Sequence, residues 1–110
     1  MSASGDVRNA YSRYVDPGFR HHNPYFRGSA DALAAGMEAN ASEFPNKSLK
    51  VERAIEDGDL VAVHSRVRLK PDGQDMALVH IFRFSGDRIV ELWDVGQPVP
   101  AEMQNEHGMF

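Results

Sequence analysis

The sequence predicts one α+β domain spanning residues 1–110, with helices first and an antiparallel sheet after them. Apolar residues recur at helical spacing up to about residue 44 and at every second position from Leu49 to Val95. Turn-forming residues around Gly58, Gly73 and Gly86 divide the second part into short segments. Hydrophobic residues make up 42% of the chain and charged residues 25%, which is typical of a globular domain.

Two helices are expected before the sheet. The first follows Asp6, a good N-cap, and ends at Asp16-Pro17-Gly18, because proline lacks the backbone donor. Its expected inner side carries Val7, Ala10, Tyr11, Tyr14 and Val15. The stretch RHHNPYFRG (20–28) is expected to be irregular. Ser29 is a suitable N-cap for the second helix, over 30–43, in which Gly36 is a weak point.

Four strands are expected after the helices, at 49–56, 60–70, 76–84 and 88–95. In the second of these, Val61, Val63, Val67 and Leu69 share one face. His64 falls on the less apolar face of the same strand. If that face lines a pocket, His64 is a further acid/base candidate. A hydrogen-bonded strand histidine is the simpler interpretation.

The turn in HIFRFSGDRIVELWDV decides which residues share a face of the last hairpin. A two-residue Gly86-Asp87 loop would place His80 opposite Trp93 and put Asp94 on the other face. A three-residue loop would place His80 and Asp94 together, surrounded by apolar residues, with Trp93 on the opposite face. We favour the three-residue loop because it collects one coherent apolar face, although Gly-Asp is also an acceptable short turn.

An imidazole and a carboxylate in an apolar setting suit proton transfer. Burial raises the pKa of a carboxyl group, and a neighbouring protonated histidine lowers it again. Such a pair can hold one mobile proton near neutral pH. The alternative is a buried histidine–aspartate hydrogen bond with no chemical role.

Several classes of function have no support in the sequence. The net charge is −4 and no basic stripe marks a nucleic-acid or membrane surface. The chain has no cysteine, and no pair of its five histidines has the helical spacing of a zinc site, so we expect no metal. No P-loop, dinucleotide fingerprint or nucleophile elbow is present. MSASGDVRNAYSRYV lacks the apolar core of a signal peptide, and we expect a cytoplasmic protein.

Four segments together resemble one family. They are HNP (22–24), GDLVAVHS (58–65), IFRF with RIVELWDV (81–95), and an ending with QPVP (97–100) and GMF (108–110). The chain is similar to the SnoaL-like polyketide cyclase group of the nuclear-transport-factor-2-like (NTF2-like) superfamily. Two residue types depart from the pattern of many relatives, since His80 stands where Asp is common and Leu92 where His is common.

The resemblance implies a cone, in which a curved antiparallel sheet of about four to five strands and N-terminal helices enclose a hydrophobic pocket. It implies an aspartate that acts as acid/base without a cofactor, and a histidine beside it; Asp94 and His80 match these two. It also implies a homodimer packed through the outer sheet face. Trp93, on that face with Ile81 and Val79, is expected in the interface.

The stretch RHHNPYF has two interpretations. His22 or Asn23 points into the pocket and binds a substrate carbonyl, or the Asn23 side chain ties down its own loop. His21 is expected to be solvent-exposed. The remaining expected substrate contacts are Tyr14, His64, Leu78, Phe82 and Leu92.

Two functions of different classes follow. The first is a cyclase or isomerase that performs enolate chemistry on a small hydrophobic carbonyl compound, with Asp94 moving the proton and His80 tuning or relaying it. The second is a non-catalytic ligand-binding or dimerisation module. A protein–protein adaptor would be favoured if side chains such as Phe82 and Phe84 filled the pocket.

Overall fold

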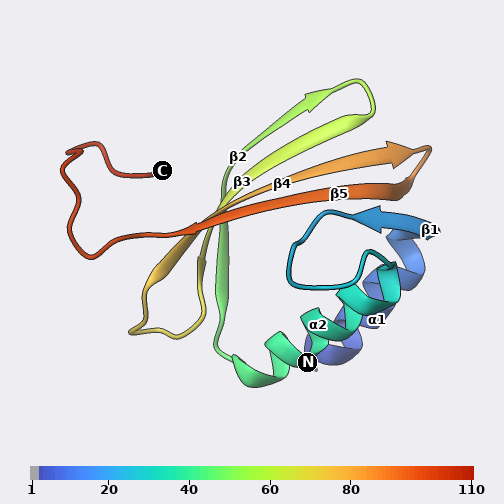
Figure 1. Ribbon diagram of the computed structural model, residues 1–110, viewed down its shortest axis with the longest axis horizontal. Coiled ribbons are helices and arrows are strands. Elements are labelled where there is room, and N and C mark those ends of the chain that lie inside the picture. Colours follow the sequence, from blue (N-terminus) through green and yellow to red (C-terminus); the bar gives the residue numbers. More distant parts are fainter. Residues whose placement is uncertain (1–2) are drawn as a thin grey trace.

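The computed structural model describes residues 3–110, with side chains from residue 7 onward, as two helices and one five-stranded sheet (Figure 1). The helices are α1 (Ala3–Tyr14) and α2 (Ala30–Glu43). The strands are β1 (Val15–His21), β2 (Ser48–Asp57), β3 (Leu60–Arg68), β4 (Asp75–Ser85) and β5 (Arg88–Pro98). The sheet order is β1-β5-β4-β3-β2, with β1 parallel to β5 and every other pair antiparallel. The expected α+β class is confirmed.

Strand β1 lies where the end of the first helix, its terminating turn and the start of irregular chain were expected. Val15 pairs with Ile89, and Arg20 and His21 pair with Glu91 and Leu92. Between the first two of these pairs, β1 contains three more residues than β5, so the pairing is interrupted there. Pro17 and Gly18 fall in this interruption, and the Gly18 N–H is satisfied by Asp16 Oδ1 at 2.7 Å rather than by β5. The strand was not predicted because Pro17 and Gly18 interrupt the alternation of apolar and polar residues by which strands are recognised in a sequence.

The two helices pack against each other and against β1, and α1 also reaches β5. Helix α1 begins at Ala3 rather than after Asp6. Ser29 caps α2 as expected, because its side chain accepts a hydrogen bond from Ala32 N at 3.2 Å. Gly36 in α2 has a packing role, since a Cβ there would lie 2.4 Å from the Phe26 ring.

The β4–β5 hairpin corrects the expected turn. Ser85 pairs with Arg88, so the loop has two residues, Gly86 and Asp87. Gly86 has φ 61°, a left-handed conformation that favours glycine. One residue further along, Val90 is an extra residue on β5, which shifts the register so that Arg83 pairs with Glu91. With a two-residue loop alone, His80 would lie opposite Trp93. The extra residue moves the pairing by one position and brings His80 opposite Asp94.

The register defines two sheet faces. The inner face, on the helix side, carries His80 and Asp94 together with Leu78, Phe82 and Leu92. The outer face carries Arg83, Glu91 and Trp93. The buried core joins Phe19 of β1, Leu33 of α2 and Leu92 of β5, so it lies at the β1 edge beneath the helices.

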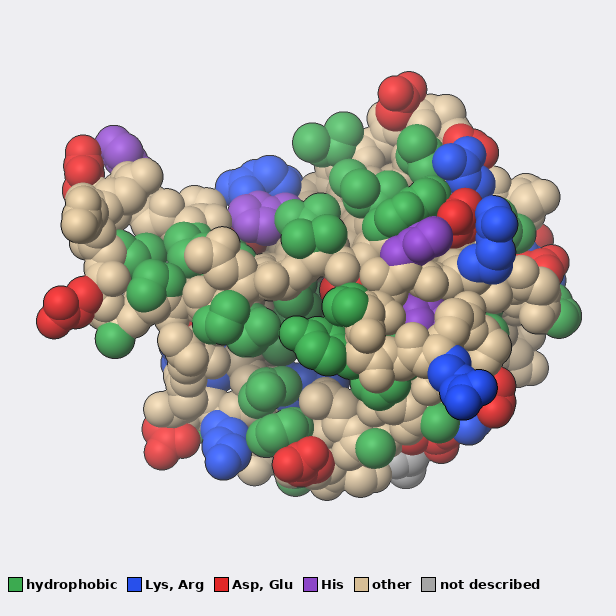
Figure 2. Space-filling model, viewed as in Figure 1, with side chains coloured by type: hydrophobic (Ala, Val, Ile, Leu, Met, Phe, Trp, Pro, Cys, Tyr) green, Lys and Arg blue, Asp and Glu red, His purple; other side chains and the backbone are tan. Residues whose placement is uncertain are grey.

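The inner face is covered unevenly. Figure 1 shows both helices below the β1 edge of the sheet. At the opposite edge, the β2 side chains Leu49 and Val51 remain exposed. Figure 2 shows hydrophobic side chains through the middle of the view and charged ones mostly around its rim. In the described part of the chain, neither helix has the length and apolar character needed to cross a membrane.

Candidate active site

His80 and Asp94 face each other across β4 and β5 on the inner face. His80 Nε2 lies 3.4 Å from Asp94 Oδ1, a distance of an ion pair that is long for a hydrogen bond. The two side chains are 22% and 20% exposed, so both are partly open to solvent. The Phe82 ring lies beside the imidazole, with ring centroids 5.9 Å apart.

Asn23 completes a line of three polar side chains. Its Nδ2 donates to Asp94 Oδ2 at 2.8 Å, while its Oδ1 accepts from Tyr25 N at 2.9 Å. These partners fix the orientation of the amide, because a carboxylate needs a donor and a backbone N–H needs an acceptor. Both interpretations of Asn23 are therefore partly met: the side chain ties its own loop and also reaches the inner face.

His21 is a residue whose place the sequence did not reveal. It is 6% exposed, which corrects the expected solvent exposure. Its Nδ1 accepts from Asn23 N at 3.1 Å, and its Nε2 donates to the Arg27 carbonyl. The ring thus holds both ends of the loop that carries Asn23. Alternation along β1 would have predicted this inward position, had the strand been recognised.

The surroundings hold Asp94 in its ionised form. The His80 ring beside it is the main cause that lowers the pKa of Asp94 below its usual value, against the opposing effect of burial. The hydrogen bond from the Asn23 amide and the nearby His21 ring lower it further. At neutral pH Asp94 is therefore a carboxylate, suited to accept a proton or to stabilise a nearby cation.

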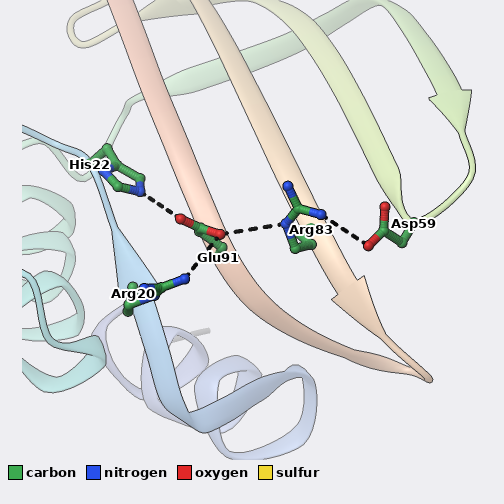
Figure 3. Close-up of polar contacts among 5 residues, drawn as sticks. All are labelled: Arg20, His22, Asp59, Arg83 and Glu91. Atoms are coloured by element: carbon green, nitrogen blue, oxygen red, sulfur yellow. Dashed lines mark hydrogen bonds and ion pairs between the residues drawn. The ribbon is translucent and has the colours of Figure 1, made fainter.

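His22 lies on the outer face, which corrects its expected place in the pocket. Successive residues of an extended chain point to opposite sides, so His22 and Asn23 cannot both face inward. The His22 ring stacks on Trp93, with centroids 5.1 Å apart, and its Nε2 lies 2.8 Å from Glu91 Oε2. Figure 3 shows Arg20, His22 and Arg83 converging on Glu91, and Arg83 reaching on to Asp59.

His64 and Tyr14 also lie away from the pair. His64 is on the outer face, where Arg53 donates to its Nδ1 and the Phe110 ring stacks on it. Tyr14 ends α1 and is 53% exposed. Tyr11, one turn earlier, takes the more enclosed place against Phe19 and donates to Met37 Sδ at 3.1 Å; burial raises its pKa to about 12.

The expected apolar contacts surround the pair to different degrees. Leu78 pairs with Gly96 and packs over it, since a Cβ added at Gly96 would lie 2.6 Å from Leu78 Cδ2. Gly96 follows Asp94 by two positions on β5, so Leu78 lies beside Asp94 on the same face. Phe82 borders His80. Leu92 is buried in the core, which leaves little of its surface for a ligand.

Two surface depressions lie elsewhere. One of about 480 Å³ is lined by residues of α1, α2 and the start of β1, including Arg8, Tyr11 and Asp31. Another of about 430 Å³ lies by the turns at Gly58 and Gly86. An enclosed cavity around His80 and Asp94 therefore stays a prediction. Among the side chains that the structure describes, from residue 7 onward, no three histidines or carboxylates are grouped so as to hold a metal ion.

Comparison with solved structures gives relatives of the same fold at low sequence identity. IdmH from Streptomyces antibioticus, a proposed polyketide cyclase, is 20% identical, with a TM-score of 0.69 over 86% of this chain and 83% of that one. A proposed isomerase of the SnoaL-like family from Agrobacterium tumefaciens strain C58 is 18% identical, with a TM-score of 0.71 over 89% and 85%. TsrD from Streptomyces laurentii is 20% identical, with a TM-score of 0.69 over 87% and 79%.

No curated protein matches the chain. The family model of the SnoaL-like domain matches residues 2–92, which include both helices, four strands and the first part of β5. The fold and the match together confirm the resemblance seen in the sequence: the chain belongs to the SnoaL-like domain family.

Proposed function

We propose that this protein is a cofactor-free cyclase or isomerase that moves a proton on a small hydrophobic carbonyl compound. The observation that carries the proposal is the line Asn23–Asp94–His80 on the inner face, flanked by Leu78 and Phe82. Polar groups that converge within an apolar surface are typical of sites that orient a small molecule.

The chemistry begins at a carbon next to the carbonyl. The His80–Asp94 pair removes the proton, and the electron pair of the C–H bond moves to the carbonyl oxygen to form an enolate. Asn23 has a second amide hydrogen, beyond the one given to Asp94, that can donate to this oxygen. Ring closure, isomerisation and dehydration share the enolate and differ in the shape of the substrate.

The relatives support the class of reaction. One is described as a proposed polyketide cyclase and another as a proposed isomerase, and both reactions pass through an enolate when they act on a ketone. At this low identity they contribute the fold, while the argument for chemistry depends on the residues of this chain.

The test is exchange of α-hydrogens in D₂O, followed by NMR over a panel of apolar ketones. The wild type is expected to catalyse exchange on at least one ring-forming or cyclic ketone. Asp94→Asn should lower the rate about 10²–10⁴-fold, and Asp72→Asn, in an exposed turn, should leave it unchanged. Full activity of Asp94→Asn on a verified substrate would contradict the role of the pair.

A binding module is the second candidate. Its supporting observation is that both oxygens of Asp94 already face partners, as in a satisfied polar contact. A binding module predicts that an apolar ligand binds Asp94→Asn and the wild type with nearly equal affinity and that no α-exchange occurs. Calorimetry on the same ketone panel separates the two functions.

We also propose that two copies associate through the outer face. Ile55 and Val95 are 65% and 64% exposed there, on the same face as Trp93. Exposed apolar residues on a sheet face favour burial against a second copy. Val95→Lys should then shift the sedimentation coefficient from that of a dimer to that of a monomer. The cytoplasm remains the expected compartment.

A further inference from the structure

We propose that His80, through Nδ1, is the group that accepts the substrate proton, and that Asp94 and Asn23 position and support it. This assignment depends on the proposed function and reverses the roles expected from the family resemblance. In that expectation the aspartate moves the proton and the histidine tunes it.

The first argument is the orientation of the imidazole. Nε2 is the ring nitrogen that faces Asp94 Oδ1, at 3.4 Å. A lone pair directed at a carboxylate would be repelled, so Nε2 carries the hydrogen and the neutral ring keeps its lone pair on Nδ1. Among the described residues, Nδ1 of His80 has no hydrogen-bond partner, so it is the uncommitted basic atom of the site.

The second argument is the state of Asp94. Its Oδ1 faces the His80 ring and its Oδ2 accepts from Asn23 at 2.8 Å, so each oxygen already has a polar partner. These partners stabilise the carboxylate, which makes it a weaker base toward carbon. A carboxylate held in this way is better suited to stabilise a positive charge that forms on its neighbour.

The third argument is the support behind Asp94. Asn23 is held by Tyr25 N at its side-chain oxygen and by the His21 ring at its backbone N–H. The arrangement therefore runs from a buried ring, through an amide and a carboxylate, to an imidazole. Each link fixes the next, as expected of side chains that orient a base rather than act on substrate.

The step balances within the site. The Nδ1 lone pair takes the α-hydrogen, the C–H electron pair becomes the C=C bond of the enolate, and the carbonyl oxygen takes the negative charge. The resulting imidazolium lies against the Asp94 carboxylate. Return of the proton from Nδ1, to carbon or to a new alkoxide, restores the neutral ring.

The charged groups that face His80 are few. Asp94 on β5 lies opposite it, and His21 on β1 also affects the pKa of Asp94. On β3, the residue opposite His80 is Val63, which does not titrate. The pH dependence of the site should therefore reflect His80 and Asp94.

The experiment compares kcat/KM for α-exchange across pH 4–9 in the wild type, His80→Gln, Asp94→Asn and the exposed control His107→Gln. We expect the wild-type rate to fall on acidification with the protonation of an imidazole rather than of a carboxylate, so the acidic limb should lie well above about pH 4. His80→Gln should lose about 10²–10⁴-fold at pH 7.5. Asp94→Asn should also lose activity within this range, but less than His80→Gln, because the imidazolium formed on His80 then lacks its carboxylate partner.

Two results would overturn the assignment: a wild-type profile that stays flat down to about pH 4, or a His80→Gln variant with nearly full activity at pH 7.5. A measurement without substrate separates this proposal from the proposed function. ¹⁵N NMR of the histidine rings should show His80 protonated at Nε2 at pH 7.5, with Nδ1 taking up the second proton as pH falls. If no ketone exchanges, the proposed function fails, and the ring measurement still decides which nitrogen is basic: protonation at Nδ1 in the neutral ring would refute the assignment.

Discussion

His80 lies opposite Asp94 although the turn between their strands has only two residues. A regular hairpin with this turn would place His80 opposite Trp93. The extra residue Val90 changes the parity, so that the inner face receives the carboxylate and the outer face receives the indole. The pairing that the chemistry needs therefore depends on a bulge close to the turn.

The turn itself gives the first prediction. Gly86→Ala should lower the free energy of unfolding by about 1–2 kcal/mol, because φ is 61° and a Cβ disfavours that conformation. No atom lies within 4 Å of the added Cβ, so the effect is one of backbone strain rather than crowding. Urea unfolding measures it. Gly86→Asn should lose clearly less, since asparagine tolerates this region, and equal losses in the two variants would contradict the explanation.

Gly36 and Phe26 give the second prediction. Gly36→Ala alone should destabilise the protein, by about 1 kcal/mol, because the new methyl group would displace the Phe26 ring that lies 2.4 Å from its position. In a Phe26→Ala background the same change should stabilise α2 by up to about 1 kcal/mol, the usual advantage of alanine over glycine in a helix. A double-mutant cycle from thermal or urea unfolding measures the coupling, and additive effects would show that the ring and the glycine do not interact.

Glu91 gives a prediction about pH. The hydrogen bond from His22 is the main cause that lowers the pKa of Glu91, burial opposes it, and Arg20 and Arg83 lower it further. Because the folded state favours the carboxylate, its stabilising effect is fully present above the ordinary pKa of about 4.5 and is lost as pH falls through the lower folded value. Glu91→Gln should therefore be less stable than the wild type at pH 7, with a gap that narrows below about pH 4.5.

Urea unfolding from pH 3 to pH 7 measures this gap. The exposed Glu102→Gln is the control and should follow the wild type throughout. A gap between wild type and Glu91→Gln that does not change with pH would mean that the carboxylate contributes through packing alone.

Phe110 gives the fourth prediction. Its ring lies 4.2 Å from the Arg66 guanidinium and stacks on His64, which attaches the C-terminal segment to the outer face. Phe110→Ala should cost about 0.5–1 kcal/mol and raise hydrogen exchange over residues 99–110. His107→Ala, at an 85% exposed position, is the control. Unchanged exchange in Phe110→Ala would show that other contacts hold the segment.

The sequence predicted the parts of the fold that follow simple periodicity. The second helix with its Ser29 cap and the four later strands derive from spacing and turn residues. His80 and Asp94 do share a face as predicted, but the prediction relied on a three-residue turn that the structure does not have. It did not predict β1, whose alternation is broken by Pro17 and Gly18, or the bulge at Val90, which carries no distinctive residue type.

The wrong placements of His21 and His22 arose because β1 was not predicted. Once β1 is known to run beside β5, alternation places His21 and Asn23 inward and His22 outward. Without it, neighbouring residues in RHHNPYF could not be assigned to faces. Contacts such as Asn23–Asp94 join residues 71 positions apart, and local patterns carry no information about them.

That separation has a consequence for how the protein is made. Strand β1 finds its partner only in β5, so a growing chain lacks the polar site until β5 has been synthesised. Contacts between distant parts of a chain also slow folding, since a long loop must close before they form. During synthesis, β1 and the helices should therefore lack stable contacts with the sheet after β2, β3 and β4 have paired. The addition of β5 would then complete the sheet and the site in one step.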